Sequence, residues 1–182
     1  MTSRLRTHRV IIALLGGVGL SLCDRVHIHY GVLIPTDTSF MGQAWWVLPM
    51  FCFLAYAIVP AWRLLRRRLA DAPLTTTGAE LGFSLVAFFA AYACTGPLAA
   101  WGTSLAALLT LAWAARILRR RCGALVLFSL LLAILGPATE ATIAGLGLFA
   151  YDHPDLGPIP VWLPTIYLHG ALLVADLDGF LD

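Results

Sequence analysis

The chain has 182 residues; 60% are hydrophobic, only 12% are Asp, Glu, Lys or Arg, and the formal net charge is +2. Soluble domains carry about 25% charged residues, so this composition excludes a water-soluble globule and predicts an integral membrane protein. The few basic residues form no broad positive surface, so nucleic acid is not an expected partner. Lysine and asparagine are both absent. Because every codon for either begins with two adenines, we infer a GC-rich, bacterial genome.

Arginines mark the predicted topology. All 12 basic residues are arginines, and all but Arg25 lie in three clusters: Arg4, Arg6 and Arg9; Arg63 and Arg66–Arg68; Arg116 and Arg119–Arg121. A pair of apolar segments follows each cluster, and basic residues beside membrane spans stay in the cytoplasm. This pattern predicts an all-α, six-transmembrane helix bundle with cytoplasmic N and C termini. The predicted spans, within one membrane domain over residues 1–182, are residues 10–28, 43–63, 78–95, 98–118, 123–149 and 161–178.

The first two predicted spans carry signals of close packing and of an interface. Residues 10–28 follow basic residues and could be a signal peptide, but no small-residue cleavage site follows, so we expect a retained span. Its glycines, Gly16, Gly17 and Gly19, would let another helix approach closely and make a homo-oligomer possible. The second span opens with Trp45 and Trp46, which are typical of a membrane–water interface.

Ionisable residues inside apolar spans are costly, so each is a candidate functional residue. Glu140 lies one turn after Gly136–Pro137, where we expect the fifth span to be interrupted and kinked. His169 lies near the middle of the sixth span. On sequential spans the two could face each other as a buried pair or a proton relay; the alternative is that each is only hydrogen-bonded to a neighbouring helix.

Other ionisable residues and the cysteines give weaker signals. Asp24, Glu80 and Asp176 lie near the ends of their spans, and we expect Arg25 to pair with Asp24 and the Arg66–Arg68 cluster to pair with Glu80. The four cysteines lack metal or redox spacing and are expected to be free thiols, although a Cys23–Cys94 disulfide is possible. No catalytic residue, metal site or cofactor motif is predicted, so an enzyme is not expected.

Two motifs resemble a known family. The run Ala44-Trp45-Trp46-Val47-Leu48-Pro49 is similar to the Ala-Trp-Trp-Val-Pro-Pro signature of the Insig (insulin-induced gene) proteins. The stretch Tyr151–Asp155, followed by Trp162-Leu163-Pro164 and Gly170, resembles their last outer loop and final span. Insigs are polytopic sensors without catalytic activity, and animal members bind oxysterol and retain a sterol-sensing escort protein. The resemblance implies a bacterial homologue that binds a lipid.

The resemblance also implies where the lipid binds and which partner of the animal proteins is not expected here. The family's pocket is expected among the middle spans, including the third and fourth, which here contain Val86, Phe88, Thr103 and Ser104. Animal members need an acidic residue at the inner end of span four for their protein partner. Arg119, Arg120 and Arg121 occupy that place here, so an animal-type sterol escort protein is not an expected partner.

The sequence therefore predicts a non-enzymatic lipid- or sterol-binding protein of the bacterial inner membrane. The expected ligand is a sterol or a diacylglycerol-like lipid in a cavity between the helices. The predicted lipid-binding residues are Val86, Phe88, Thr103, Ser104, Glu140, Thr142 and His169. The alternatives are a small proton-coupled transporter and an intramembrane isoprenoid isomerase or cyclase, both using Glu140 and His169.

Overall fold

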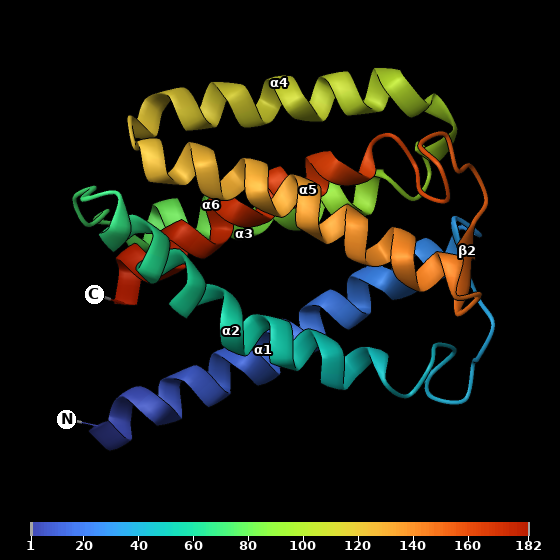
Figure 1. Cartoon of the computed structure of the whole chain (residues 1–182), viewed down its shortest axis with the longest axis horizontal. Helices are drawn as coiled ribbons and strands as arrows, with labels where there is room; N and C mark the ends of the chain where they lie inside the picture. The colour runs from blue at the N-terminus through green and yellow to red at the C-terminus, as the bar shows by residue number, and fades with distance from the viewer. Residues whose placement is uncertain (1, 182) are drawn as a thin grey trace.

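The computed structural model describes residues 2–181, with residues 2–8 as helical backbone only (Figure 1). In this part of the chain we find six α-helices, one short 3-10 helix and two short strands. In chain order these are α1 Thr2–His29, β1 Leu33–Pro35, α2 Val47–Arg68, α3 Gly78–Cys94, η1 Ala99–Trp101, α4 Gly102–Arg120, α5 Gly123–Gly145, β2 Phe149–Tyr151 and α6 Leu163–Leu181. The prediction of an all-helical membrane fold is confirmed; the strands were not predicted.

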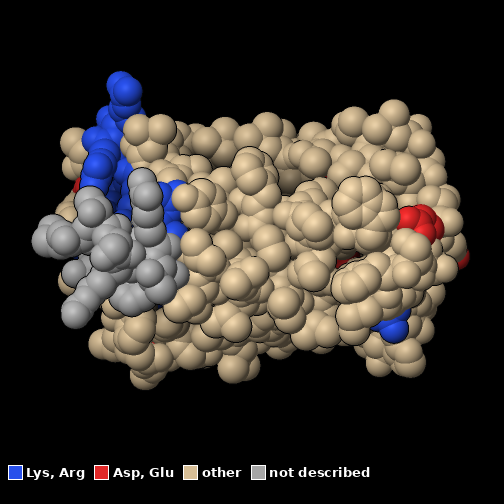
Figure 2. Space-filling view, turned by 90° about the horizontal axis from the view of Figure 1, so that it is seen from below, with Lys and Arg blue, Asp and Glu red and all other residues tan. Residues whose placement is uncertain are grey.

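In the described part of the chain, four helical segments are long and apolar enough to cross a membrane: Arg9–His29, Val47–Arg68, Ala99–Arg120 and Gly123–Gly145. Helix α3 is apolar but has only 17 residues, and α6 carries Asp176 and Asp178. On the face shown in Figure 2, basic atoms gather mainly at one end and the middle of the molecule carries almost no charge. These features support an integral membrane protein. Six crossings and cytoplasmic termini stay predictions.

The helices form two groups. Helices α1 and α2 pack closely against each other, whereas α6 lies among α3, α4 and α5 and also touches α2 (Figure 1). Buried residues occur on every side of α6, which is typical of a central helix. The α1–α2 pair therefore lies against a four-helix body whose axis is α6.

The two strands join both groups at the end of the molecule that lies opposite the beginning of α1 and the end of α6 (Figure 1). They pair antiparallel, with Leu33 opposite Tyr151 and Pro35 opposite Phe149. The α1–α2 connection is thereby tied to the α5–α6 connection. This pairing fixes Tyr151 near the outer ends of the helices, where "outer" denotes the strand end from here on.

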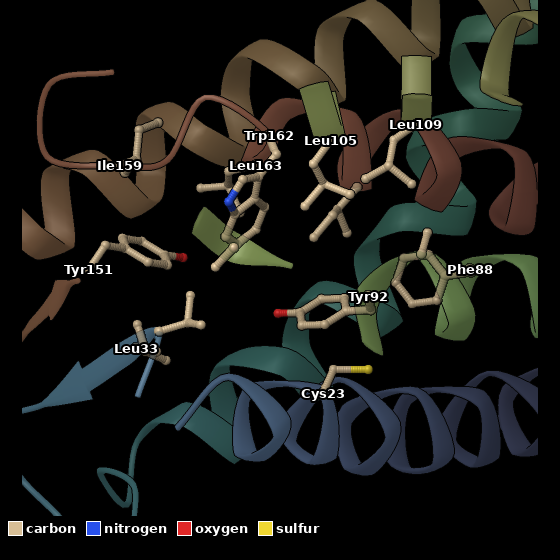
Figure 3. Packing of buried hydrophobic residues seen from close by; sticks show 14 residues of the cluster. Cys23, Leu33, Phe88, Tyr92, Leu105, Leu109, Tyr151, Ile159, Trp162 and Leu163 are labelled. Carbon is tan, nitrogen blue, oxygen red and sulfur yellow. The ribbon is translucent and has the colours of Figure 1, made fainter. Parts of the chain in front are cut away.

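A cluster of buried apolar residues fills the outer half of the bundle (Figure 3). Phe88 and Tyr92 of α3, Leu105 and Leu109 of α4, and Trp162 before α6 belong to it. A second cluster around Trp62 and Phe128 fills the arginine-rich end. The bundle therefore has a cluster of buried apolar residues at each end.

Three local predictions need correction. Helix α5 ends at Gly145 rather than residue 149, because the chain turns there into β2. It also continues as helix through Pro137, so the proline does not interrupt it. All four cysteines are free thiols, so the possible Cys23–Cys94 disulfide is not formed.

Candidate functional site

A cavity of about 400 Å³ lies between the α1–α2 pair and helices α3, α5 and α6. Its walls are almost entirely apolar side chains, and among the residues whose side chains the structure describes Glu140 is the only charged one that lines it. Among the aromatic residues that line it are Phe51, Phe88, Phe89, Tyr92 and Tyr167. We call this the inner cavity. Its volume falls within the range of roughly 300–1,000 Å³ that is typical of small-molecule sites.

Glu140 on α5 is held by two tyrosines from other elements. The hydroxyl of Tyr151 on β2 donates to one carboxyl oxygen, and the hydroxyl of Tyr167 on α6 donates to the other. Burial, and next the Glu140 charge, raise the pKa of Tyr151 well above its usual range. Its hydroxyl therefore stays protonated and remains a donor to the carboxyl group.

A glycine makes room for this arrangement. Gly136 lies one helical turn before Glu140, and a β-carbon there would be only 2.1 Å from a ring carbon of Tyr167. The Tyr167 ring thus packs directly on the α5 backbone, and its hydroxyl reaches Glu140. Gly136 serves the site through this contact.

A second cavity of about 360 Å³ lies beside the first, toward the outer end. Glu140 and Tyr167 line both cavities, whereas Asp24 and Gln43 line only the second, which we call the outer cavity. Asp24 accepts a hydrogen bond of 2.7 Å from the Tyr92 hydroxyl, so its predicted pairing with Arg25 is wrong. On the face shown in Figure 2, acidic atoms are visible at the base of a small opening.

His169 lies elsewhere. Its Nε2 donates to the Leu109 carbonyl oxygen at 3.0 Å, and its Nδ1 lies 3.2 Å from the Arg116 guanidinium. A carbonyl oxygen can only accept, so the ring has its proton on Nε2 and accepts from Arg116 at Nδ1. The hypothesis that His169 faces Glu140 is wrong, because the two side chains bind different partners on different helices.

Arg116 is part of a charged network at the arginine-rich end. It donates to Ser84 on α3 at 2.6 Å, and Ser84 donates to Asp176 on α6. Arg120 pairs with Asp176 at 2.7 Å. The network therefore joins α3, α4 and α6.

Two further acids lie at this end of the molecule. Asp178 pairs with Arg63 and Arg66 of α2. Glu80 caps α3 together with Thr77 and lies 3.4 Å from Arg120, so its predicted pairing with the Arg66–Arg68 cluster is wrong. In the described part of the chain, no three His, Cys, Asp or Glu side chains are placed to hold a metal ion.

The structure brings together only part of the predicted lipid-binding set. Phe88 and Glu140 line the inner cavity. The other predicted residues, Val86, Thr103, Ser104, Thr142 and His169, line neither cavity. The first four are exposed on the surface of the bundle and His169 is buried in contact with α4. Helix α4 contributes nothing to either cavity, so the expected participation of span four is not found.

Sequence reasoning missed several residues of the site: Asp24, Gln43, Tyr92, Tyr151 and Tyr167. The sequence does contain a signal for Asp24, because it is an acid at the end of a span. An acid with no opposite charge on the same face of its helix needs a partner on another element. The tyrosines carried no signal, because tyrosine occurs both in packed cores and at membrane interfaces.

No protein-family model matches the chain, and no curated protein sequence matches it significantly. Two solved structures do match. The first is an Insig homologue, MvINS, from Mycobacterium vanbaalenii, with a TM-score of 0.81 and 24% identity, covering 96% of this chain and 93% of that chain. The second is a cross-linked trimer of MvINS with one arginine-to-cysteine substitution, with a TM-score of 0.78 and 26% identity, covering 95% and 92%. The predicted resemblance is therefore confirmed: this chain has the fold of a mycobacterial Insig homologue.

Proposed function

We propose that this protein is a non-enzymatic membrane protein that holds one amphipathic lipid, a sterol or a diacylglycerol-like molecule, in the inner cavity. The observation that carries the proposal is a cavity of about 400 Å³ with apolar walls and one carboxyl group at its outer boundary. Apolar walls with a few placed polar groups are the usual composition of a lipid or cofactor site. The fold shared with MvINS supports it.

The helix arrangement supports a preformed cavity rather than a packing defect. Phe88 and Phe89 meet edge to face with their ring centroids 5.4 Å apart and both line the inner cavity, so together they form one part of its wall. Gly170 of α6 lies opposite, where a β-carbon would stand 3.4 Å from the Phe88 ring. The lipid body would lie between these aromatic rings and the α1–α2 pair, with its polar head toward Glu140.

The test is native mass spectrometry of the protein purified in mild detergent, followed by extraction and identification of the lipids that accompany it. We expect one chemically defined lipid per chain. In Gly170→Leu, the added side chain would fill part of the inner cavity, and we expect the bound fraction to fall about tenfold, which corresponds to roughly 1.4 kcal/mol. A protein that carries only a mixed set of membrane lipids would contradict the proposal.

A matched variant separates cavity filling from a general effect of leucine at a helix glycine. Gly82 of α3 lines neither cavity, and nothing lies within 4 Å of a β-carbon built there. Gly82→Leu should therefore keep the bound lipid. Equal loss in both variants would show that the lipid does not depend on the inner cavity.

The geometry does not favour the two alternative functions. Proton-coupled transport and isoprenoid cyclisation were both expected to use Glu140 and His169 together, and these residues bind separate partners.

We propose in addition that the protein resides in a bacterial inner membrane and associates with copies of itself. The cross-linked trimer of MvINS supports the self-association.

A further inference from the structure

We propose that four arginines at the arginine-rich end, Arg67, Arg68, Arg119 and Arg121, bind the phosphate group of an anionic phospholipid from the surrounding bilayer. We call these four residues the arginine surface. None of them lines the inner or the outer cavity. The inference is therefore independent of the lipid proposed for the inner cavity, and it adds a second lipid with a different head-group chemistry.

Two segments that are distant in the sequence form the arginine surface. Its first pair ends α2, and its second pair lies at the end of α4. The α2–α3 and α4–α5 connections lie at the same end of the molecule (Figure 1). Asp71 follows Arg68 within one turn of chain. Its side chain accepts a hydrogen bond of 2.5 Å from the backbone amide of Ala124, which follows Arg121 equally closely. This bond holds the two pairs of arginines beside each other.

The acids around the arginine surface do not neutralise its charge. All four of its residues are exposed, and in the part of the chain that the structure describes none of them forms an ion pair. The acids described at this end bind other groups; they are Asp71, Glu80, Asp176 and Asp178. A guanidinium group suits a phosphate because its N–H groups can form paired hydrogen bonds to the phosphate oxygens.

The depth of these arginines favours a phospholipid over a soluble anionic partner. The apolar segments Val47–Arg68 and Ala99–Arg120 end at the arginine surface, so its side chains lie where the apolar layer meets water. Leu64 on α2 and Leu118 on α4 are 58% and 76% exposed just before the arginines. A phospholipid can place its phosphate on the arginines and an acyl chain along these leucines. A soluble anion would leave the leucines uncovered.

The test is native mass spectrometry of the full-length protein in mild detergent, titrated with dioleoylphosphatidylglycerol or with dioleoylphosphatidylcholine. The two lipids have the same acyl chains and the same phosphate, but the choline head adds a positive charge. We expect phosphatidylglycerol to bind about tenfold more tightly. Gly170→Leu, which fills part of the inner cavity, should bind it equally well. Loss of binding in that variant would mean that the phospholipid enters the inner cavity, and the proposal would be wrong.

Single substitutions assign the binding to the arginine surface. Arg68→Gln and Arg121→Gln should each weaken the binding of phosphatidylglycerol about fivefold, the usual contribution of one basic residue beside an anionic headgroup. Both side chains are exposed and form no ion pair with a described residue, so we expect both variants to fold. Arg25→Gln is the matched control, because Arg25 is also exposed but lies near the other end of α1. It should bind like the original protein.

Asp71→Ala distinguishes an assembled site from a general attraction by net charge. The substitution removes a negative charge, so it would strengthen the binding of an anion to a surface that acts through net charge alone. It also removes the bond to the Ala124 amide that holds the two pairs of arginines together. We therefore expect Asp71→Ala to weaken the binding of phosphatidylglycerol severalfold, which is the opposite direction.

The other outcomes contradict the proposal in different ways. If phosphatidylcholine binds as tightly as phosphatidylglycerol, or if Arg68→Gln and Arg121→Gln bind like the original protein, the arginine surface is not a site for anionic phospholipid. If Arg25→Gln loses as much binding as Arg68→Gln, the lipid has no specific place on the molecule. If Asp71→Ala binds more tightly, the arginines act through net charge and the assembled site is wrong.

Discussion

A β-carbon built on Gly136 would lie 2.1 Å from a ring carbon of Tyr167, and two further ring carbons would be within 2.4 Å. No side chain larger than hydrogen fits there while the Tyr167 ring keeps its place. The same ring carries the hydroxyl that donates to Glu140. A single glycine on α5 thus determines whether the carboxyl group at the cavity boundary has both of its tyrosine donors.

We therefore predict that Gly136→Ala destabilises the protein by about 1–3 kcal/mol, the usual cost of forcing extra atoms into a packed site. Gly82→Ala is the matched control, since a β-carbon there meets nothing within 4 Å and alanine favours a helix by about 1 kcal/mol over glycine. Thermal unfolding in mild detergent measures both. A Gly136→Ala protein as stable as Gly82→Ala would show that the contact is not maintained.

Glu140 illustrates how far single residues could be predicted. A lone acid in an apolar helix stands out in the sequence, and the structure places it at the boundary of both cavities. Thr142, which was predicted to line a cavity, is exposed and donates to the Ala138 carbonyl of its own helix. A hydroxyl group can donate a hydrogen bond to a carbonyl oxygen of its own helix in this way. A carboxylate cannot, because it has no hydrogen to donate. Charge was therefore the reliable signal and hydroxyl groups were not.

At the scale of helices, α6 is joined to its neighbours by acids near its end. Asp176 lies beside Ser84 of α3 and Arg120 of α4, while Asp178 pairs with Arg63 and Arg66 of α2. Residues two apart on a helix lie on nearly opposite faces. One short acidic segment therefore connects α6 with helices on both sides.

We predict that Asp178→Asn lowers the stability of the protein by about 3 kcal/mol, the lower end of the cost of removing one partner from a buried ion pair. The Asp178 side chain is 0% exposed and that of Arg66 is 7% exposed. Glu80→Gln is the control: its ion pair with Arg120 is exposed, and glutamine can still cap α3. Equal shifts of the unfolding temperature in both variants would contradict a buried ionic link.

The α1–α2 pair has a different kind of contact. A β-carbon on Gly17 would lie 2.3 Å from the Cys52 sulfur and 2.8 Å from the Cys52 backbone nitrogen. The glycines of the first span were predicted to allow close helix approach, and here they do so within one chain. Self-association through these glycines stays a prediction, since α2 already occupies part of that face.

At the scale of the whole molecule, the arginine clusters and the apolar segments sufficed to predict the helices. The short strands escaped prediction because three-residue segments such as Leu33–Pro35 carry no periodic pattern. A cavity between the helices is expected from the sequence, but its position and most of its lining residues are not, because they depend on how the α1–α2 pair lies against the body of the bundle. That arrangement follows from contacts between distant segments, such as Leu33 with Tyr151, which no local pattern encodes.

The positions of the arginines predict how the molecule is oriented in the membrane. The beginning of α1, the end of α6 and the α2–α3 and α4–α5 connections lie at one end of the molecule, and both strands lie at the other (Figure 1). Arg63, Arg66–Arg68 and Arg119–Arg121 lie at or near the first end. Since basic residues are retained on the cytoplasmic side, we expect this end to face the cytoplasm.

Reporter fusions in a bacterial host measure this orientation. Green fluorescent protein at the C terminus should fluoresce, and alkaline phosphatase inserted after Asp155 in the full chain should be active, because the first folds in the cytoplasm and the second only outside it. The matched control is alkaline phosphatase inserted within residues 70–76, between α2 and α3, which should be inactive. Activity at residues 70–76 together with inactivity after Asp155 would mean that the molecule is inserted the other way. The outer cavity, which Asp24 and Glu140 line, would then lie at the cytoplasmic side.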